Sequence, residues 1–132
     1  MSQELILIVE DQPLNRKLVR DVLQSKGYRT LESETAEEGL RLAREHLPAL
    51  VLMDIQLPGM NGIEALKELR ASPETSRIPV LAFTASVMPQ DRKEIMSAGF
   101  DGFVSKPINI KVFLEAVREA LDRRPDVSVP SR

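Results

Sequence analysis

Cysteine is absent from this chain of 132 residues, which excludes disulfide bonds, thiol catalysis and thiolate metal sites. Aromatic residues make up only 4%, so the chain offers no platform on which nucleic-acid bases would stack. The nearly balanced formal charge of −2 gives no reason to expect nucleic acid or an anionic membrane as a partner. The apolar runs are too short to cross a bilayer, and the first residues do not resemble a signal peptide. We therefore expect a cytoplasmic protein with one hydrophobic core.

Short apolar runs alternate with helical patterns along the chain. Unbroken apolar runs, typical of strands buried on both faces, are Leu5–Val9, Ala49–Met53 and Ile78–Phe83, and shorter strands are predicted at Tyr28–Leu31 and Phe100–Val104. Amphipathic helices are predicted after each strand. This pattern indicates an α/β fold, with a doubly wound five-stranded parallel sheet in the order 2-1-3-4-5 and five helices on its two faces, as in flavodoxin-like proteins. Residues 1–122 form the predicted domain, and residues 123–132 are predicted to be a disordered tail.

Two helical segments carry finer expectations. In the first helix Leu14, Leu18, Val22 and Leu23 share one face, so we expect them to be buried. In the fourth helix the charged run 91–94 is typical of a solvated face.

The residues that could carry chemistry follow the predicted strands at their carboxyl ends. They are Glu10, Asp11, Asp54, Thr84 and Lys106. Because parallel strands point the same way, we expect all five to meet at one edge of the sheet. The simpler alternative is an ordinary solvated loop edge with an incidental acidic pair.

Three clustered carboxylates repel one another, and a hard divalent cation such as Mg²⁺ would relieve that repulsion. A lysine and a threonine hydroxyl opposite them would bind phosphoryl oxygens. The chemistry that suits this set is phosphoryl transfer onto Asp54, which would form an acyl phosphate.

The segments 9–11, 53–62, 83–85 and 105–107 together resemble the motif series of response-regulator receiver domains of two-component signalling. The resemblance covers roughly residues 4 to 122 in the family's order and spacing, and it is closest to single-domain regulators of the DivK type. It implies that Asp54 accepts a phosphoryl group from a histidine kinase or a histidine phosphotransfer protein. The chain would then be a signalling module that catalyses only its own phosphorylation and dephosphorylation.

The resemblance also implies roles for the other residues. Asp11 would bind Mg²⁺ directly, Glu10 largely through water, and the backbone carbonyl of Gln56 would complete the protein's share of the ligands. Thr84 and Lys106 would bind the phosphoryl group, and the bond between Lys106 and Pro107 would be cis. Phe103 matches the aromatic switch position, although some members of the family have tyrosine there.

Phosphorylation is expected to be read by a downstream protein. The starting methionine and the polar tail lead us to expect a chain that acts alone through such partners. The predicted binding face is formed by the fourth helix, the fifth strand and the fifth helix, and its residues are Lys93, Ser97, Phe103, Lys111, Val112 and Glu115.

Two other functions fit the same architecture less well. A haloacid-dehalogenase-type phosphatase also uses a strand-end aspartate and Mg²⁺, but it needs a second acid where Gln56 stands. A flavin- or dinucleotide-binding protein needs a glycine-rich or Ser/Thr-rich phosphate loop after the first strand, where Glu10 and Asp11 would repel phosphate.

Overall fold

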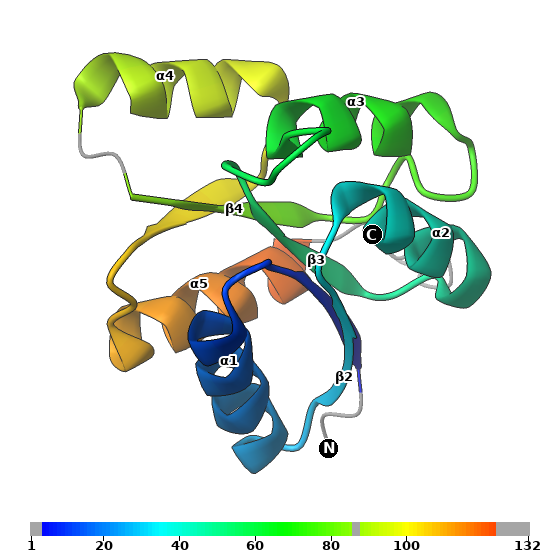
Figure 1. The fold of residues 1–132 in the computed structure, drawn as a ribbon. Coiled ribbons are helices and arrows are strands. Elements are labelled where there is room, and N and C mark those ends of the chain that lie inside the picture. Colours follow the sequence, from blue (N-terminus) through cyan, green and yellow to red (C-terminus); the bar gives the residue numbers. More distant parts are fainter. Residues whose placement is uncertain (1–3, 86–87, 124–132) are drawn as a thin grey trace.

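The computed structural model describes residues 4–85 and 88–123. Five parallel strands form one sheet in the order β2-β1-β3-β4-β5, which confirms the predicted topology (Figure 1). The strands are β1 (Leu5–Val9), β2 (Arg29–Ser33), β3 (Leu50–Asp54), β4 (Val80–Thr84) and β5 (Gly102–Ser105). The helices are α1 (Pro13–Ser25), α2 (Ala36–His46), α3 (Gly62–Ala71), α4 (Pro89–Ala98) and α5 (Ile110–Arg123). Among the described residues, none of the helices combines the length and apolar character that a membrane span requires.

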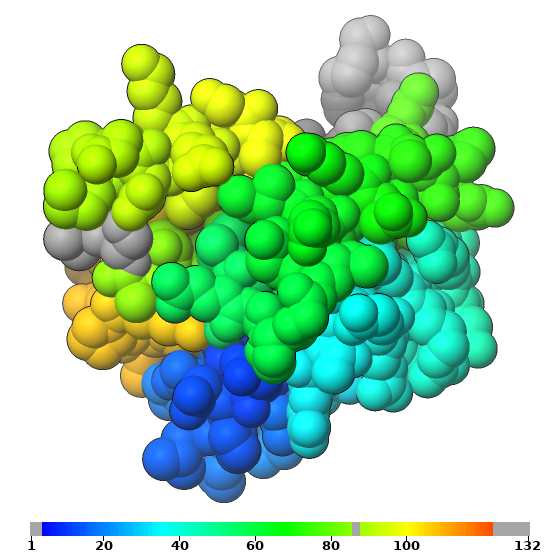
Figure 2. Space-filling view, turned by 45° about the horizontal axis from the view of Figure 1, so that its top comes forward, coloured from blue at the N-terminus to red at the C-terminus, as the bar shows by residue number. Residues whose placement is uncertain are grey.

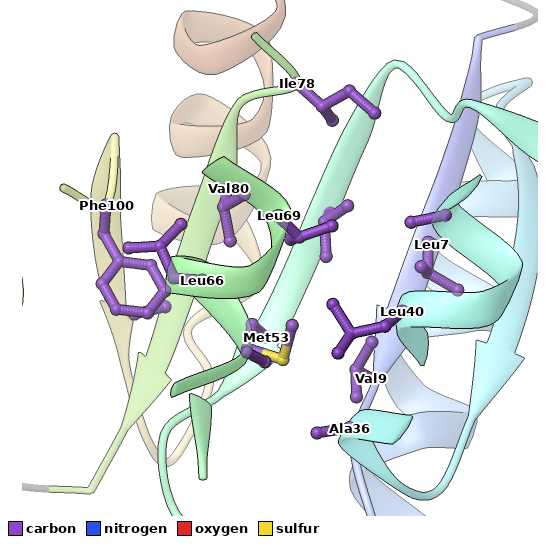
Figure 3. Close-up of a cluster of buried hydrophobic side chains, with 14 of the residues drawn as sticks. Leu7, Val9, Ala36, Leu40, Met53, Leu66, Leu69, Ile78, Val80 and Phe100 are labelled. Carbon is purple, nitrogen blue, oxygen red and sulfur yellow. The ribbon is translucent and has the colours of Figure 1, made fainter. Parts of the chain in front are cut away.

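The sheet separates two hydrophobic clusters, because successive side chains of a strand point to opposite faces. In β1, Leu7 and Val9 pack in the cluster that includes residues of α2, α3 and α4 (Figure 3), whereas Ile6 and Ile8 pack in the cluster with α1 and α5. All four side chains are fully buried. Burial on both faces explains why the central strands are continuous apolar runs rather than alternating ones.

The pairing of the strands places the polar strand ends side by side. β1 pairs with β3 so that Val9 lies opposite Met53, and the residues that follow, Glu10 and Asp54, therefore lie at the same edge of the sheet. β3 pairs with β4, and β4 pairs with β5 so that Thr84 lies opposite Ser105. The carboxyl ends of β1, β3, β4 and β5 thus form one continuous edge.

Side-chain caps fix the beginnings of the helices that follow β3 and β5. The side chain of Asn61 accepts a hydrogen bond from the Glu64 N–H, and the Glu64 carboxylate accepts one from the Asn61 N–H, a complete capping box at the start of α3. The side chain of Asn109 accepts from the Val112 N–H at the start of α5. Both caps follow loops from the carboxyl edge, so they help to fix the path of these loops.

The predicted buried face of α1 is partly wrong. Leu14 is 81% exposed and Leu18 is 36% exposed, whereas Val19 and Leu23 are the buried residues of the helix. Two apolar residues are adjacent at positions 18 and 19, and the sheet selects the face that carries Val19. The predicted tail lies outside the described residues from position 124 onward.

Candidate functional site

The three predicted acids come together at the carboxyl edge of the sheet. Glu10, Asp11 and Asp54 each offer a carboxylate oxygen, and these oxygens lie within 4.8 Å of one another. Glu10 is fully buried, Asp54 is 3% exposed and Asp11 is half-buried. Figure 2 shows how the start of α1 (blue), the loop after β3 (green) and the β5–α5 region (orange) meet on one face of the molecule. Sequence segments far apart in the chain therefore build one acidic site.

The backbone around Asp54 holds its carboxylate in place. The Gln56 N–H donates to Asp54 Oδ1 at 2.9 Å, and the Gly62 N–H donates to the carbonyl of Ile55 at 3.1 Å. A Cβ at position 62 would lie 2.5 Å from the carbonyl oxygen of Asp54, so no side chain fits there without a shift of the backbone. The first residue of α3 therefore packs directly against the end of β3.

Lys106 is the cation that faces these acids. Its Nζ lies 2.9 Å from Asp54 Oδ2 and 3.1 Å from Glu10 Oε1, and its side chain is 17% exposed. The Lys106 N–H donates to the carbonyl of Thr84 at 2.8 Å, which ties the loop after β5 to the end of β4. The peptide bond between Lys106 and Pro107 is cis, as the resemblance implied.

Burial and mutual charge perturb the ionisation of two of these groups. Burial raises the pKa of the Glu10 carboxyl, and the neighbouring charge of Asp54 adds to the rise, although the Gln12 N–H opposes it by donating to Glu10 Oε2. For Lys106, burial alone would lower the pKa, but Asp54 and Glu10 outweigh burial and raise it. The site thus concentrates negative charge that the half-buried Lys106 only partly offsets.

The donor set fits a hard divalent cation. Carboxylate oxygens are the ligands that Mg²⁺ prefers, and one or two carboxylates with water suffice to hold it. Gln56 lies two residues beyond Asp54 with an exposed side chain. Metal binding by Glu10, Asp11 and Asp54, and through the Gln56 carbonyl, stays a prediction.

One of the two predicted switch residues, Thr84, lines a small cavity. Thr84 is buried at the end of β4, and Phe103 in β5 is half-buried against the cluster of α2, α3 and α4. A cavity of about 170 Å³ lies next to the threonine, and its lining residues are Ile55, Gln56, Ile63, Thr84, Asp91, Glu94 and Ile95. Space for a rearrangement between β4, α3 and α4 therefore exists.

Two arginines have contacts that the sequence analysis did not predict. Arg92 was predicted to lie on a solvated face of α4, but its guanidinium carbon lies 5.2 Å from the centre of the Phe103 ring and its Nε is buried. The prediction was wrong for this residue because the neighbouring strand presents an aromatic ring. Arg16 in α1 donates from Nη1 to the carbonyl of Glu10 at 2.9 Å.

The proposed partner face is accessible. Lys93 and Ser97 of α4 and Lys111, Val112 and Glu115 of α5 are exposed, and Phe103 of β5 is half-buried. Exposure makes these residues available to a partner, and binding there stays a prediction.

Comparison with known proteins identifies the family to which the chain is similar. A family model of the response regulator receiver domain matches residues 6–118. The polar-differentiation response regulator DivK of Brucella ovis is 44% identical over 116 residues, which cover 88% of this chain and 94% of that protein.

Solved structures show the same fold. A response regulator from Chloroflexus aurantiacus superposes with a TM-score of 0.88 at 27% identity, covering 92% of this chain and 99% of the other. The receiver domain of the sensor histidine kinase PA1611 from Pseudomonas aeruginosa, which has magnesium coordinated in its active-site cleft, gives a TM-score of 0.84 at 29% identity and covers 91% and 98% of the two chains. From the matched family model, the relatives and the edge of acids with its opposed lysine, this chain belongs to the response-regulator receiver domains of two-component signalling.

Proposed function

We propose that this receiver domain is switched by phosphorylation of Asp54. The observation that supports the proposal is the placement of this buried carboxylate beside Lys106 and the two other acids, at the carboxyl edge of the sheet. The donor would be a phosphohistidine on a histidine kinase or on a histidine phosphotransfer protein. The phosphorus–nitrogen bond would break, a phosphorus–oxygen bond to Asp54 would form, and a proton would restore the neutral imidazole.

The chain's own residues would divide the work of this transfer. Asp54 would supply the attacking oxygen while the Gln56 N–H holds the carboxylate. Lys106 would follow the charge from the carboxylate to the phosphoryl oxygens, and Thr84 would donate its hydroxyl to another of these oxygens. When bound by Glu10, Asp11, Asp54 and the Gln56 carbonyl, Mg²⁺ would supply positive charge that offsets the carboxylates and the phosphoryl oxygens.

The phosphorylated chain would act by binding other proteins, and it would catalyse only its own phosphorylation and dephosphorylation. We place the downstream partner on the face of α4, β5 and α5. Thr84 drawn toward the phosphoryl group would change the space into which Phe103 packs, and Phe103 belongs to that face. The haloacid-dehalogenase-type alternative gains no support, because Gln56 stands where that chemistry needs a second acid.

The test is the incorporation of phosphate from a small phosphodonor, acetyl phosphate, with Mg²⁺. Intact-mass spectrometry should show one added phosphoryl group on the wild type and none on Asp54→Asn, whose amide is a poor nucleophile. Glu37→Gln, at an exposed position of α2, serves as the matched control and should be phosphorylated like the wild type. Phosphate on Asp54→Asn would refute the assignment, and continuous release of phosphate from unrelated phosphate esters would favour the phosphatase.

A further inference from the structure

A single guanidinium group, that of Arg16, joins the loop after β1 to the end of β2 and the loop that follows it. Its Nη1 donates to the carbonyl of Glu10 at 2.9 Å, its Nε lies 3.3 Å from Glu32 Oε1, and its Nη2 lies 3.5 Å from Glu34 Oε2. The side chain is only 15% exposed, although it begins on the surface helix α1. The planar fork of an arginine can span three acceptors in this way, whereas the ammonium group of a lysine cannot reproduce the geometry.

The carbonyl that Arg16 contacts belongs to the peptide that links Glu10 to Asp11. Because a peptide unit is planar, an anchor on this carbonyl also fixes the direction in which the chain enters Asp11. The Glu10 N–H is held as well, since it donates at 3.0 Å to the carbonyl of Ser33, the last residue of β2, which directly precedes Glu34. The backbone on both sides of Glu10 is therefore attached to the end of β2 and to the loop that follows it.

The charge of Arg16 and its geometry have opposite expected effects on the affinity of the site for a divalent cation. A permanent cation this close to the acids would, by charge alone, weaken the binding of a divalent cation. Glu32 and Glu34 lie against the guanidinium and offset part of that charge. Geometry has the opposite effect, because a fixed Glu10–Asp11 peptide keeps the carboxylates converged and lowers the entropy lost on binding.

We propose that Arg16 is a positioning residue for the divalent-cation site, and that its hold on the Glu10–Asp11 peptide outweighs its unfavourable charge. The inference rests on the proposed function, since it assigns Arg16 a part in the binding of Mg²⁺. Arg16 also connects the loop after β2 to the site through Glu34. Loss of the Glu34 carboxylate should therefore weaken Mg²⁺ binding, but by less than loss of Arg16.

Titration with Mg²⁺, followed by calorimetry or by backbone amide shifts, tests the inference on four proteins. Arg16→Ala should bind Mg²⁺ about tenfold more weakly than the wild type, which is the usual loss when an outer contact of a metal ligand is removed. Arg20→Ala is the matched control. It removes the same positive charge, and Arg20 also pairs with Glu32, but the contacts of Arg20 are with the side chains of Glu32 and Asp21 and not with the Glu10 carbonyl. Its affinity should equal or exceed that of the wild type. Arg16→Lys keeps the charge but not the fork, so it should remain several-fold weaker.

Unchanged or tighter binding by Arg16→Ala would overturn the inference, and so would an equal loss in Arg16→Ala and Arg20→Ala. A second measurement needs no metal: in the presence of EDTA, ¹⁵N relaxation should show a more mobile Asp11 amide in Arg16→Ala and Arg16→Lys than in the wild type. Equal mobility would also overturn it. If the wild type bound no Mg²⁺, the proposed function would fail, whereas the relaxation result would still decide whether Arg16 fixes this peptide. Should Arg16→Ala not fold, as judged by circular dichroism, Arg16→Lys provides both readouts.

Discussion

Replacing Lys106 by methionine tests how much the acidic site depends on its one facing lysine. The change keeps an unbranched apolar stem and removes the positive charge. The lysine is held between two carboxylates that are buried, at 2.9 Å from Asp54 and 3.1 Å from Glu10. Its raised pKa means that it is charged in the neutral range, so the substitution leaves two buried carboxylates without this partner.

The size of the effect follows from these distances. Each pair of opposite charges at about 3 Å gains about 5 kcal/mol of attraction at an effective dielectric constant of about 20. Desolvation of the groups cancels part of this gain, and removing one partner of a buried pair typically costs about 3–5 kcal/mol. Glu10, whose pKa burial already raises, can take up a proton and so limits the loss. We therefore expect the free energy of unfolding of the metal-free protein to fall by about 3 kcal/mol, the lower end of that range.

Urea unfolding in the presence of EDTA measures this loss. With a slope of about 2 kcal/mol per molar urea, Lys106→Met should unfold at a midpoint about 1.5 M below that of the wild type. Lys111→Met is the control, because Lys111 is exposed on α5, and its midpoint should stay close to that of the wild type. Addition of Mg²⁺ should stabilise Lys106→Met more than the wild type, since the cation offsets carboxylates that the lysine no longer faces. Equal midpoints for Lys106→Met and Lys111→Met would refute the reasoning, because the two ion pairs would then contribute nothing net.

Three further predictions concern the metal, the switch and the backbone. Asp11→Asn should lose Mg²⁺ binding in a calorimetric titration, and undiminished affinity would contradict the role of Asp11 as a ligand. Because the substitution also removes one repelling charge, the metal-free protein should be at least as stable as the wild type. Thr84→Ala should still accept phosphate, but amide shifts on the face of α4, β5 and α5 should respond less than in the wild type, and an equal response would contradict the switch. Gly62→Ala should lower the free energy of unfolding by about 1–3 kcal/mol, because the added Cβ would lie 2.5 Å from the carbonyl oxygen of Asp54. Thermal or urea unfolding measures this loss, and a stability equal to that of the wild type would show that the backbone shifts without cost.

The fold could be predicted from the sequence because its signals are local and repeated. Runs such as Leu5–Val9 are apolar at every position, which a sheet with one solvated face would not require, and each is followed by a helical pattern. Parallel order then follows from the need for crossovers. The same reasoning brought Glu10, Asp54 and Lys106 to one edge, and the structure confirms that they lie together.

The predictions that were wrong concern side chains whose burial depends on a neighbouring helix or strand and not on the local sequence pattern. In α1 the adjacent residues Leu18 and Val19 offer two apolar faces, and only contact with the sheet shows that Val19 is the buried one. In α4 the charge of Arg92 indicated solvent, but the ring of Phe103 in β5 lies under its guanidinium. The hold of Arg16 on the Glu10 carbonyl is likewise a contact between a side chain and a backbone group, which residue type alone does not specify.

These contacts indicate how a change at the edge would reach the predicted partner face. Lys106 is attached by its backbone to the carbonyl of Thr84 and by its side chain to Asp54, so both candidate phosphoryl-binding groups are coupled to the acceptor. Phe103 lies three residues before the lysine in the same short chain segment, and its ring packs beneath Arg92 of α4. Ile95 is the one residue of α4 that is buried among those described, so little apolar burial resists a shift of this helix. A displacement of Lys106 and Thr84 toward a phosphoryl group would therefore act on α4 through β5, at the place where few contacts oppose it.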